Sequence, residues 1–591
     1  MRKRVKKLLH NDEKCVTIKA LYVNLLLGGI RIMATFYASK TGEVSAREKE
    51  HSALVRELAG ECMTLLENDG TLPLAGAGKV AVYGNGVRHT VKGGTGSGDV
   101  NTRTVVTIEQ GLKEAGFEIL TGKWLDEYDK VLADAQAAYQ AELAKKAEEL
   151  HIPIFAVMFS EAFAQPDVPA ITEKEDTDTA IYVLSRNSGE GADRYNRACD
   201  YLLGENELAD IAYLAEHYEK TVLILNIANL VDTTELKKIK GLNAILLAGQ
   251  AGNATGNIVA DVVLGKSIPS GKLTDTWAAS YEDYPSSKNF SHNNGDTNDE
   301  YYSDGIYVGY RYFETFGKEV AYPFGWGLSY TTFEVEGKMT DDHTVKTTVT
   351  NTGDRAGREV VQVYAKVPDG KLEQPERRLV AFVKTKELAP GESIALELEI
   401  PEKNLVSFDE ETSSYIMEAG EYYFYIGANV KEVKEAGKRT VAKQLVYRVS
   451  KDYMKPPVAF TRLSKKDPST YPQGSLSGIA EGAHGLTYKG ERMSIPDREE
   501  LDDPEVDSWT VEELARFSVC ASSGWGMQDV GVAGRVYRLE GRDIPYYAVA
   551  DGNNGVNINK PNIGMPTSSL VCSTWDPEVS VKSDREGGKG E

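Results

Sequence analysis

The sequence predicts an α/β domain with a mostly parallel sheet, then an antiparallel β-sandwich, then an incomplete (β/α)8 barrel. Three observations support this order. Apolar runs of strand length alternate with helical patterns up to about residue 265, the period changes to two over 331–450, and a further apolar run, Ile544–Ala550, ends in Asp551-Gly552. With 591 residues, the chain is long enough for three or four domains.

The first 33 residues differ from the rest of the chain. Met1–Lys7 is basic, and Ala20–Ile30 is a mostly apolar run that is too short to span a bilayer. The acidic Asp12 and Glu13 and the lack of a clean small-residue cleavage site argue against a signal peptide. We therefore interpret residues 1–33 as a non-native or disordered extension, and we expect a cytoplasmic protein.

Apolar strands and helices alternate in the part of the chain that follows. This rhythm is typical of a parallel sheet with helices on both faces, whose functional loops lie at the carboxyl ends of the strands. The expected strands are Lys79–Tyr83, Phe117–Leu120, Ile181–Leu184, Thr221–Ile227 and Ala244–Ala248. The expected helices are Arg47–Leu66, Thr107–Ala115, Leu125–Leu150, Glu205–Tyr218 and Thr255–Leu264.

Two glycine-rich loops fall at the carboxyl ends of these strands. Gly93–Gly98 contains Ser97, and Gly189-Glu190-Gly191 places a carboxylate on backbone that is free to adopt positive φ. Taken alone, the second loop is most simply a solvated turn. A nucleotide site is an alternative for the first, but neither it nor Gly84-Asn85-Gly86 fits G-x-G-x-x-G running into a helix.

The second half of the chain begins with an aromatic stretch at residues 301–330. It suits either a sugar-stacking surface or a connector wedged between two domains, and we favour the connector. Residues 331–450 contain short alternating strands and no catalytic constellation, which indicates a structural β-sandwich. A helix at Trp509–Ser518 follows, and Asp551 then ends a buried strand, as carboxylates do at the functional face of a (β/α)8 barrel.

The composition argues against several kinds of protein. Lys and Arg total 67 and Asp and Glu total 89, so the formal net charge is −22, which argues against nucleic acid as a partner. The five cysteines lack paired spacing, and the eight histidines form no H-E-x-x-H motif. We therefore expect no metal, no cofactor, no membrane partner and a reducing compartment.

Five motifs in one order resemble glycoside hydrolase family 3, the β-glucosidase family. They are Val91–Val100, Ser185–Arg194, Leu246–Gly265, Pro269–Trp277 and Tyr322–Glu334. The resemblance implies an α/β-sandwich domain at 34–330, a fibronectin type III-like β-sandwich at 331–450, a linker at 451–477 and the start of the family's barrel at 478–591. Because the barrel-like motifs Ile544–Val556 and Ser573–Glu578 come last, the chain resembles the circularly permuted branch of the family.

The family's chemistry is retaining hydrolysis by two carboxylates. The resemblance implies that Glu190 is the general acid/base, that Asp551 holds hydroxyls of the sugar in the −1 subsite, and that Ser97 reaches the same sugar. The family's nucleophilic aspartate, in an S-D-W-type motif, has no counterpart after Asp551. A (β/α)8 barrel takes about 250 residues, whereas 478–591 offers 591 − 478 + 1 = 114. We therefore expect a truncated barrel.

The predicted function is hydrolysis of terminal non-reducing β-D-glucosyl residues, impaired in this chain because the nucleophile is missing. The expected partner is a β-glucoside or a short β-linked oligosaccharide. The alternative is a non-catalytic carbohydrate-binding or scaffold protein that keeps Ser97 and Glu190. The sequence identifies neither the sugar nor the oligomeric state, and a homo-oligomer is compatible with it.

Overall fold

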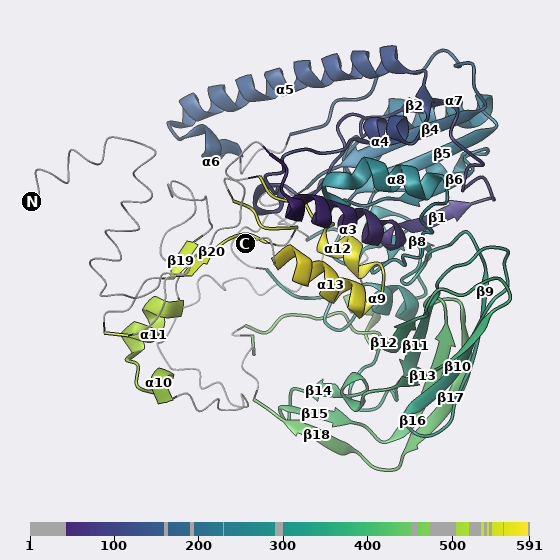
Figure 1. The fold of residues 1–591 in the computed structure, drawn as a ribbon. Helices are drawn as coiled ribbons and strands as arrows, with labels where there is room; N and C mark the ends of the chain where they lie inside the picture. The colour runs from purple at the N-terminus through teal and green to yellow at the C-terminus, as the bar shows by residue number, and fades with distance from the viewer. Residues whose placement is uncertain are drawn as a thin grey trace, which may run out of the picture.

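The structure is a computed structural model. It describes residues 43–158, 163–188, 194–228, 230–289, 300–451, 455–456, 458–471, 504–518, 534–536, 541–542, 547–552, 554–558 and 561–588. An α/β body lies at the top of Figure 1 and a β-sandwich at the bottom, and the last two helices lie between them. The predicted extension 1–33 and the predicted acid/base Glu190 lie outside the described residues.

A six-stranded sheet forms the centre of the α/β body. Its order is β1-β6-β5-β4-β2-β3, and all neighbours are parallel except the edge pair β1–β6. The predicted mostly parallel sheet is therefore confirmed. The strands are β1 (Thr64–Asn68), β2 (Lys79–Tyr83), β3 (Glu118–Ile119), β4 (Thr179–Arg186), β5 (Lys220–Ile227) and β6 (Ala244–Leu247).

The first helix is shorter than the sequence pattern predicts. Helix α3 (Ala46–Cys62) begins at a capping box formed by Ser45 and Glu48, but it ends before the predicted Leu66. Leu65 and Leu66 continue the helical spacing, yet they belong to β1 and are fully buried in the core. Burial at the sheet edge has overridden the local helical pattern, so the predicted helix Arg47–Leu66 is wrong at its carboxyl end.

The remaining helices of this body pack closely against the sheet and against each other. Helices α3, α4 and α8 stand in front of the strands in Figure 1, and α5 runs along the top. Glycines let α4 and α8 touch, since a Cβ on Gly111 would lie 2.0 Å from the Gly256 carbonyl carbon.

No helix in the described part of the chain is long and apolar enough to cross a membrane. The helices and 3-10 turns are η1 (Gly96–Gly98), α4 (Ile108–Glu114), α5 (Gly122–Leu150), α6 (Ile154–Met158), α7 (Glu205–His217), η2 (Leu236–Lys238), η3 (Gly252–Ala254) and α8 (Thr255–Val263).

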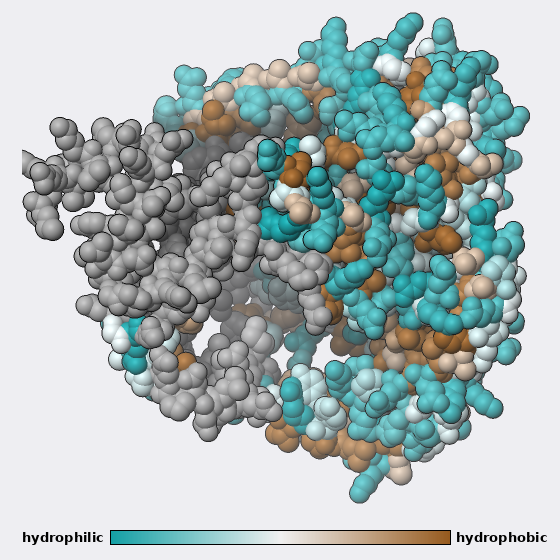
Figure 2. Space-filling model, in the orientation of Figure 1, coloured by the Kyte–Doolittle hydropathy of each residue, from teal (hydrophilic) through white to brown (hydrophobic). Residues whose placement is uncertain are grey.

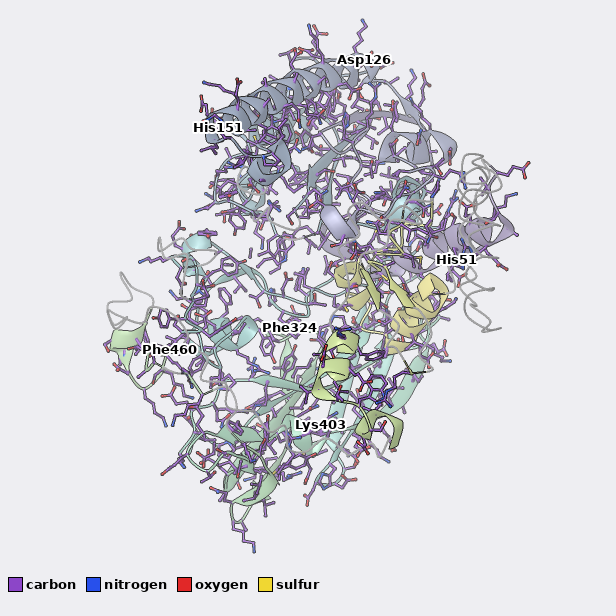
Figure 3. The ribbon with its side chains drawn as sticks, turned by 90° about the vertical axis from the view of Figure 1, so that its left-hand side faces the viewer. His51, Asp126, His151, Phe324, Lys403 and Phe460 are labelled. Carbon is purple, nitrogen blue, oxygen red and sulfur yellow. The ribbon has the colours of Figure 1, made fainter. Side chains whose placement is uncertain are left out.

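The aromatic stretch joins the α/β body to the β-sandwich. Tyr307, Tyr312 and Phe313 are buried in one cluster with Leu463, which fits a connector better than an exposed stacking surface. Figure 3 shows Phe324 near the middle of the molecule, between the two bodies. The elements here are β7 (Trp277–Ala278), η4 (Tyr281–Asp283), α9 (Tyr310–Thr315) and β8 (Val320–Tyr322), with β7 and β8 paired antiparallel.

The β-sandwich is confirmed. Sheets β13-β10-β9 and β12-β11-β16-β17 enclose an apolar core, and a third sheet, β14-β15-β18, lies beside them. Figure 2 shows brown apolar side chains at the bottom, where β15 and β18 lie, and Val446 and Val449 of β18 are exposed. The elements are β9 (Phe333–Met339), β10 (Thr344–Asn351), β11 (Val360–Lys366), β12 (Arg378–Lys384), β13 (Ser393–Glu399), η6 (Glu402–Asn404), β14 (Ser407–Asp409), β15 (Ser414–Met417), β16 (Gly420–Gly427), β17 (Val433–Val441) and β18 (Leu445–Val449).

The last part of the chain returns to the α/β body. Helices α12 and α13, yellow in Figure 1, pack against α3. Strand β20 pairs antiparallel with β19, and the prediction of an incomplete barrel stays a prediction. The elements are η7 (Pro468–Thr470), α10 (Pro504–Asp507), α11 (Val511–Ser518), β19 (Gly534–Val536), β20 (Tyr547–Val549), α12 (Ser568–Cys572) and α13 (Pro577–Gly588).

Candidate functional site

Buried amides tie the carboxyl ends of three strands together. The Asn85 side chain, just past β2, accepts a hydrogen bond from the Ser185 amide (2.7 Å) and donates one to the Ser185 carbonyl (3.0 Å). The Ser185 hydroxyl donates to Asn226 Oδ1 in β5 (2.8 Å). All three side chains are almost completely buried. Because each buried polar group has a partner, this network fixes the relative positions of the loops that follow the strands.

The same network holds the base of the first glycine loop. The amide of Val91 donates to Asn226 Oδ1 (2.7 Å), and Asn226 Nδ2 donates to the Val91 carbonyl (2.9 Å). Lys92 and Asp99 then form an ion pair across the loop. The path into this region needs glycine at position 84, since Gly84 has φ +102° and a Cβ there would lie 2.2 Å from the Val183 carbonyl oxygen. The glycine loop therefore projects from a fixed base.

The structure brings the predicted residues Ser97 and Asp551 into one region. Asn557 connects them. Its backbone N–H donates to the Asp551 carbonyl (2.7 Å), and its side-chain Nδ2 donates to the Ser97 carbonyl (3.3 Å). Asn554 Nδ2 also donates to the Gly98 carbonyl (3.1 Å) in a buried contact. The segment after β20 thus lies directly on the glycine loop, although Asn557 and Ser97 are 460 residues apart in the sequence.

The described residues that flank Glu190 are also held in this region. Ser188 lies next to the glycine loop, since a Cβ on Gly94 would be 3.7 Å from its carbonyl oxygen. Arg186 donates through Nε to the Asp200 carbonyl (3.0 Å). On the other flank, the Asp200 carboxylate pairs with Arg194 and accepts from the Tyr195 amide (3.0 Å). One residue, Asp200, therefore anchors the chain on both sides of 189–193.

The Arg186 anchor rests on a buried ion pair. Arg186 Nη2 lies 2.6 Å from Glu207 Oε2, and both side chains are only 2% exposed. Burial opposes the charge of Arg186, but the Glu207 carboxylate overcomes it and raises the arginine pKa above its usual value. Glu207 also accepts from the Gly204 amide (2.7 Å) at the start of α7. The pair links the end of β4 to α7.

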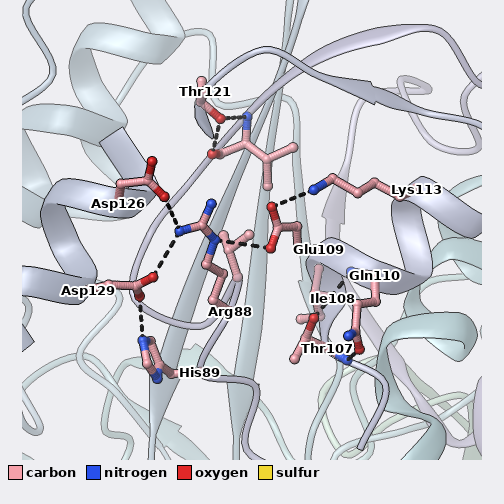
Figure 4. Close-up of polar contacts among 12 residues, drawn as sticks. Arg88, His89, Thr107, Ile108, Glu109, Gln110, Lys113, Thr121, Asp126 and Asp129 are labelled. Carbon is pink, nitrogen blue, oxygen red and sulfur yellow. Dashed lines mark hydrogen bonds and ion pairs between the residues drawn. The ribbon is translucent and has the colours of Figure 1, made fainter. Parts of the chain in front are cut away.

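A cavity of about 160 Å³ adjoins the same edge of the sheet. Asn85, Ser185 and Asn187 line it from the strand ends, and α5 lines it from the other side. Figure 4 shows how the neighbouring loop is tied to α4 and α5. The guanidinium of Arg88 contacts the carboxylates of Glu109 (3.0 Å), Asp126 (2.6 Å) and Asp129 (2.8 Å), and His89 Nε2 lies 2.6 Å from Asp129. Burial alone would raise the pKa of Asp129, but the contacts with Arg88 and His89 outweigh burial and lower this pKa.

The segment after Asp551 is anchored at a three-way junction around Trp575. The indole Nε1 donates to the Lys272 carbonyl of the α/β body (3.1 Å). The ring contacts Phe324 of the connector and Phe382 of the β-sandwich, with centroid distances of 5.3 and 5.2 Å. Next to it, Asp576 Oδ2 lies 2.5 Å from Arg358 Nη2 of the sandwich. This junction fixes where the returning segment sits.

Sequence reasoning missed the asparagines that build this region. Asn226 interrupts an apolar strand, and a polar residue in a buried run is a signal for a partnered network. Asn554 and Asn557 lie in an Asn-rich turn, where sequence alone indicates only a loop. The roles predicted for Glu190, Ser97 and Asp551 stay predictions.

Comparison with known proteins places the chain among glycosidases. Residues 63–330 match the glycosyl hydrolase family 3 C-terminal domain, and residues 359–430 match a fibronectin type III-like domain. The chain is 32% identical to a β-glucosidase of Ruminococcus albus over 90% of its own length and 57% of that protein. It is 30% identical to β-glucosidase A of Butyrivibrio fibrisolvens over 93% of its length and 74% of that protein. The chain thus spans little more than half of the first relative.

Solved structures agree with these relatives. A β-glucosidase from Paenibacillus barengoltzii superposes with a TM-score of 0.73 at 28% identity, covering 93% of this chain and 63% of that chain. A β-glucosidase 3B from Thermotoga neapolitana in complex with α-D-glucose gives a TM-score of 0.57 at 36% identity, covering 68% of this chain and 55% of that chain. The structural similarity therefore extends beyond the α/β body to most of the chain.

Proposed function

The chain belongs to glycoside hydrolase family 3, and from this premise we propose that it hydrolyses terminal non-reducing β-D-glucosyl residues. The substrate would be a β-glucoside or a short β-linked oligosaccharide. Two relatives that are 30% or more identical over most of the chain are named β-glucosidases. The chemistry is retaining hydrolysis by two carboxylates, one acting as nucleophile and one as acid and then base.

We assign three roles within this proposal. Glu190 protonates the leaving oxygen and later activates water, which requires a carboxyl whose pKa rises when sugar excludes water from it. Asp551 and Ser97 bind hydroxyls of the sugar. Hydrogen bonds that sugar hydroxyls donate to a carboxylate are stronger than those between neutral groups, so Asp551 is the main anchor.

One observation carries this assignment. Asn557 bonds to the backbone of both Asp551 and Ser97, so two residues predicted to contact the same sugar lie in one region. Ser188, two residues before Glu190, also lies against the glycine loop that contains Ser97. A single sugar ring near this loop would therefore meet Asp551 and Ser97, and the proposal places Glu190 beside it.

We expect the 591 residues alone to turn over glycosides slowly. No S-D-W-type motif for the nucleophile follows Asp551 in this sequence. Without a nucleophile on the opposite face of the sugar, the retaining mechanism lacks its first step. Sugar binding without turnover would instead favour the alternative, a carbohydrate-binding or scaffold protein derived from the family.

Two measurements test the proposal. Release of p-nitrophenol from p-nitrophenyl β-D-glucopyranoside measures turnover, which should be slow in the wild type, and Glu190→Gln should lower what remains. Glu173→Gln is the matched control, because Glu173 is an exposed glutamate on the segment leading to β4. Calorimetry with glucose measures binding, which Asp551→Asn should weaken. The proposal is wrong if glucose does not bind. Clear turnover that Glu190→Gln abolishes would contradict the expected impairment, and clear turnover that Glu190→Gln keeps at the rate of the control would contradict the role of Glu190.

A further inference from the structure

A cavity of about 760 Å³ opens between the aromatic connector and the β-sandwich. Helix α9 and the start of β12 form two of its walls, and the turn between η6 and β14 forms a third. Apolar side chains such as Ile306, Leu379 and Phe408 lie among its charged ones. Small-molecule sites in proteins have volumes of about 300–1,000 Å³. We call this cavity the connector pocket. It shares no lining residue with the candidate site.

The carboxylates that line the connector pocket already have partners. Each accepts a hydrogen bond or forms an ion pair with a neighbouring residue. The pairs are Glu373 with Tyr307 (2.7 Å), Asp409 with Lys371 (2.9 Å), Glu411 with Lys371 (2.6 Å) and Glu410 with Arg462.

Three cationic side chains of the pocket have no carboxylate partner among the described residues. Arg378 donates only to neutral oxygens, which are the Val406 carbonyl (3.0 Å), the Ser407 hydroxyl (3.1 Å) and the side-chain carbonyl of Gln374. Arg311 of α9 and Lys403 of η6 form no ion pair in the described part of the chain, and Figure 3 labels Lys403.

The two arginines act on each other. Burial, and then the nearby charge of Arg311, lower the pKa of Arg378 to about 10. The Arg378 guanidinium still carries its charge at neutral pH. Arg378 is partly buried, whereas Arg311 and Lys403 are exposed. A partly buried charge is normally paired in proteins, and a guanidinium matches the two oxygens of a carboxylate or phosphate. An anion between Arg311 and Arg378 would relieve their repulsion. Such a concentration of unpaired positive charge is unexpected on a chain whose net charge is −22.

We propose that the connector pocket binds a sugar-sized organic anion, whose carboxylate or phosphate group lies between Arg311, Arg378 and Lys403. The volume exceeds the needs of a lone phosphate ion, and the apolar walls suit the carbon skeleton of a small metabolite. The β-sandwich, for which the sequence indicated only a structural role, thereby gains a ligand site.

Calorimetry with the full chain tests this proposal. The probes are glucuronate, glucose 6-phosphate, inorganic phosphate and glucose, all at one ionic strength because charge effects depend on salt. The variant combines Arg311→Gln with Lys403→Gln. The control combines Lys338→Gln with Lys434→Gln, which removes two exposed lysines from β9 and β17 of the same sandwich.

Glucuronate or glucose 6-phosphate should bind the wild type and the control equally, and the pocket variant at least tenfold more weakly. The better of the two probes shows whether the pocket prefers a carboxylate or a phosphate. Inorganic phosphate should bind more weakly than either, and any heat from glucose should be the same in all three proteins. Since Arg311 and Lys403 form no ion pair with the described residues, the pocket variant should melt with the wild type, and Arg311→Gln alone provides the same test. Failure of both organic anions to bind, or binding unchanged in the pocket variant, overturns the proposal.

Discussion

Replacing Trp575 by Ala should detach the returning segment from the junction of the three parts of the chain. The indole is 6% exposed and contacts Phe324 and Phe382, and its N–H donates to the Lys272 carbonyl. Truncating a buried tryptophan to alanine costs about 3–5 kcal/mol, of which the lost hydrogen bond accounts for about 1 kcal/mol. Trp575 has φ 55°, and alanine at that φ carries the same backbone strain, so strain cancels in the comparison.

Differential scanning calorimetry measures this effect. For a cooperative unit of 150–250 residues, 3–5 kcal/mol corresponds to a fall in Tm of roughly 6–20 °C. Trp575→Phe keeps most of the ring contact and loses only the N–H donor, so its Tm should fall much less. Limited proteolysis should also cut within 561–588 of the Ala variant and spare the wild type. A Tm and a cleavage pattern that match the wild type would refute the inference that Trp575 anchors the segment.

Three further predictions concern the α/β body. Glu207→Gln leaves the buried charge of Arg186 unpaired, so denaturant unfolding should show a loss of about 3–5 kcal/mol, which the exposed substitution Glu205→Gln should not reproduce. Burial raises the pKa of Asp210 to about 7, so this carboxyl favours the fold while protonated, and stability is lost as the pH rises from about 4 through 7. Asn at position 210 does not titrate. The Tm of Asp210→Asn minus the Tm of the wild type should therefore be larger at pH 8 than at pH 5, and an equal difference at both pH values contradicts this reasoning. Asn557→Ala removes the bond to the Ser97 carbonyl, so glucose should bind about tenfold more weakly in calorimetry, and unchanged binding would argue against its positioning role.

The central strands could be predicted from sequence because burial on both faces requires an unbroken apolar run. β4 and β5 show this clearly, since nearly all their residues are buried and each contains an apolar run, Ala180–Leu184 in β4 and Val222–Leu225 in β5. The predicted helix Arg47–Leu66 extended too far because Leu65 and Leu66 suit either a helix or a strand. Only pairing with β6, nearly 180 residues later, decides between them.

The candidate site was harder to predict than the sheet. The loops of Ser97 and Asp551 could be located because glycines and a strand-ending acid are local signals. Their proximity depends on side-chain amides of Asn554 and Asn557, which bond to backbone carbonyls more than 450 residues away. Bonds of this kind leave no periodic trace in a sequence. Unpaired cations, such as those of the connector pocket, are equally invisible until their neighbours are known.

The hydrogen bond between Asn557 and the glycine loop, which we call the clasp, also determines when the candidate site can form during synthesis. Domains synthesised first generally fold first, at about 5–20 residues per second, so the α/β body and the sandwich can form before the clasp exists. Contacts of such long sequence separation are slow to form because a large loop must close. The nascent chain would therefore carry an uncovered glycine loop for many seconds. Sugar binding should appear last among the properties gained during synthesis.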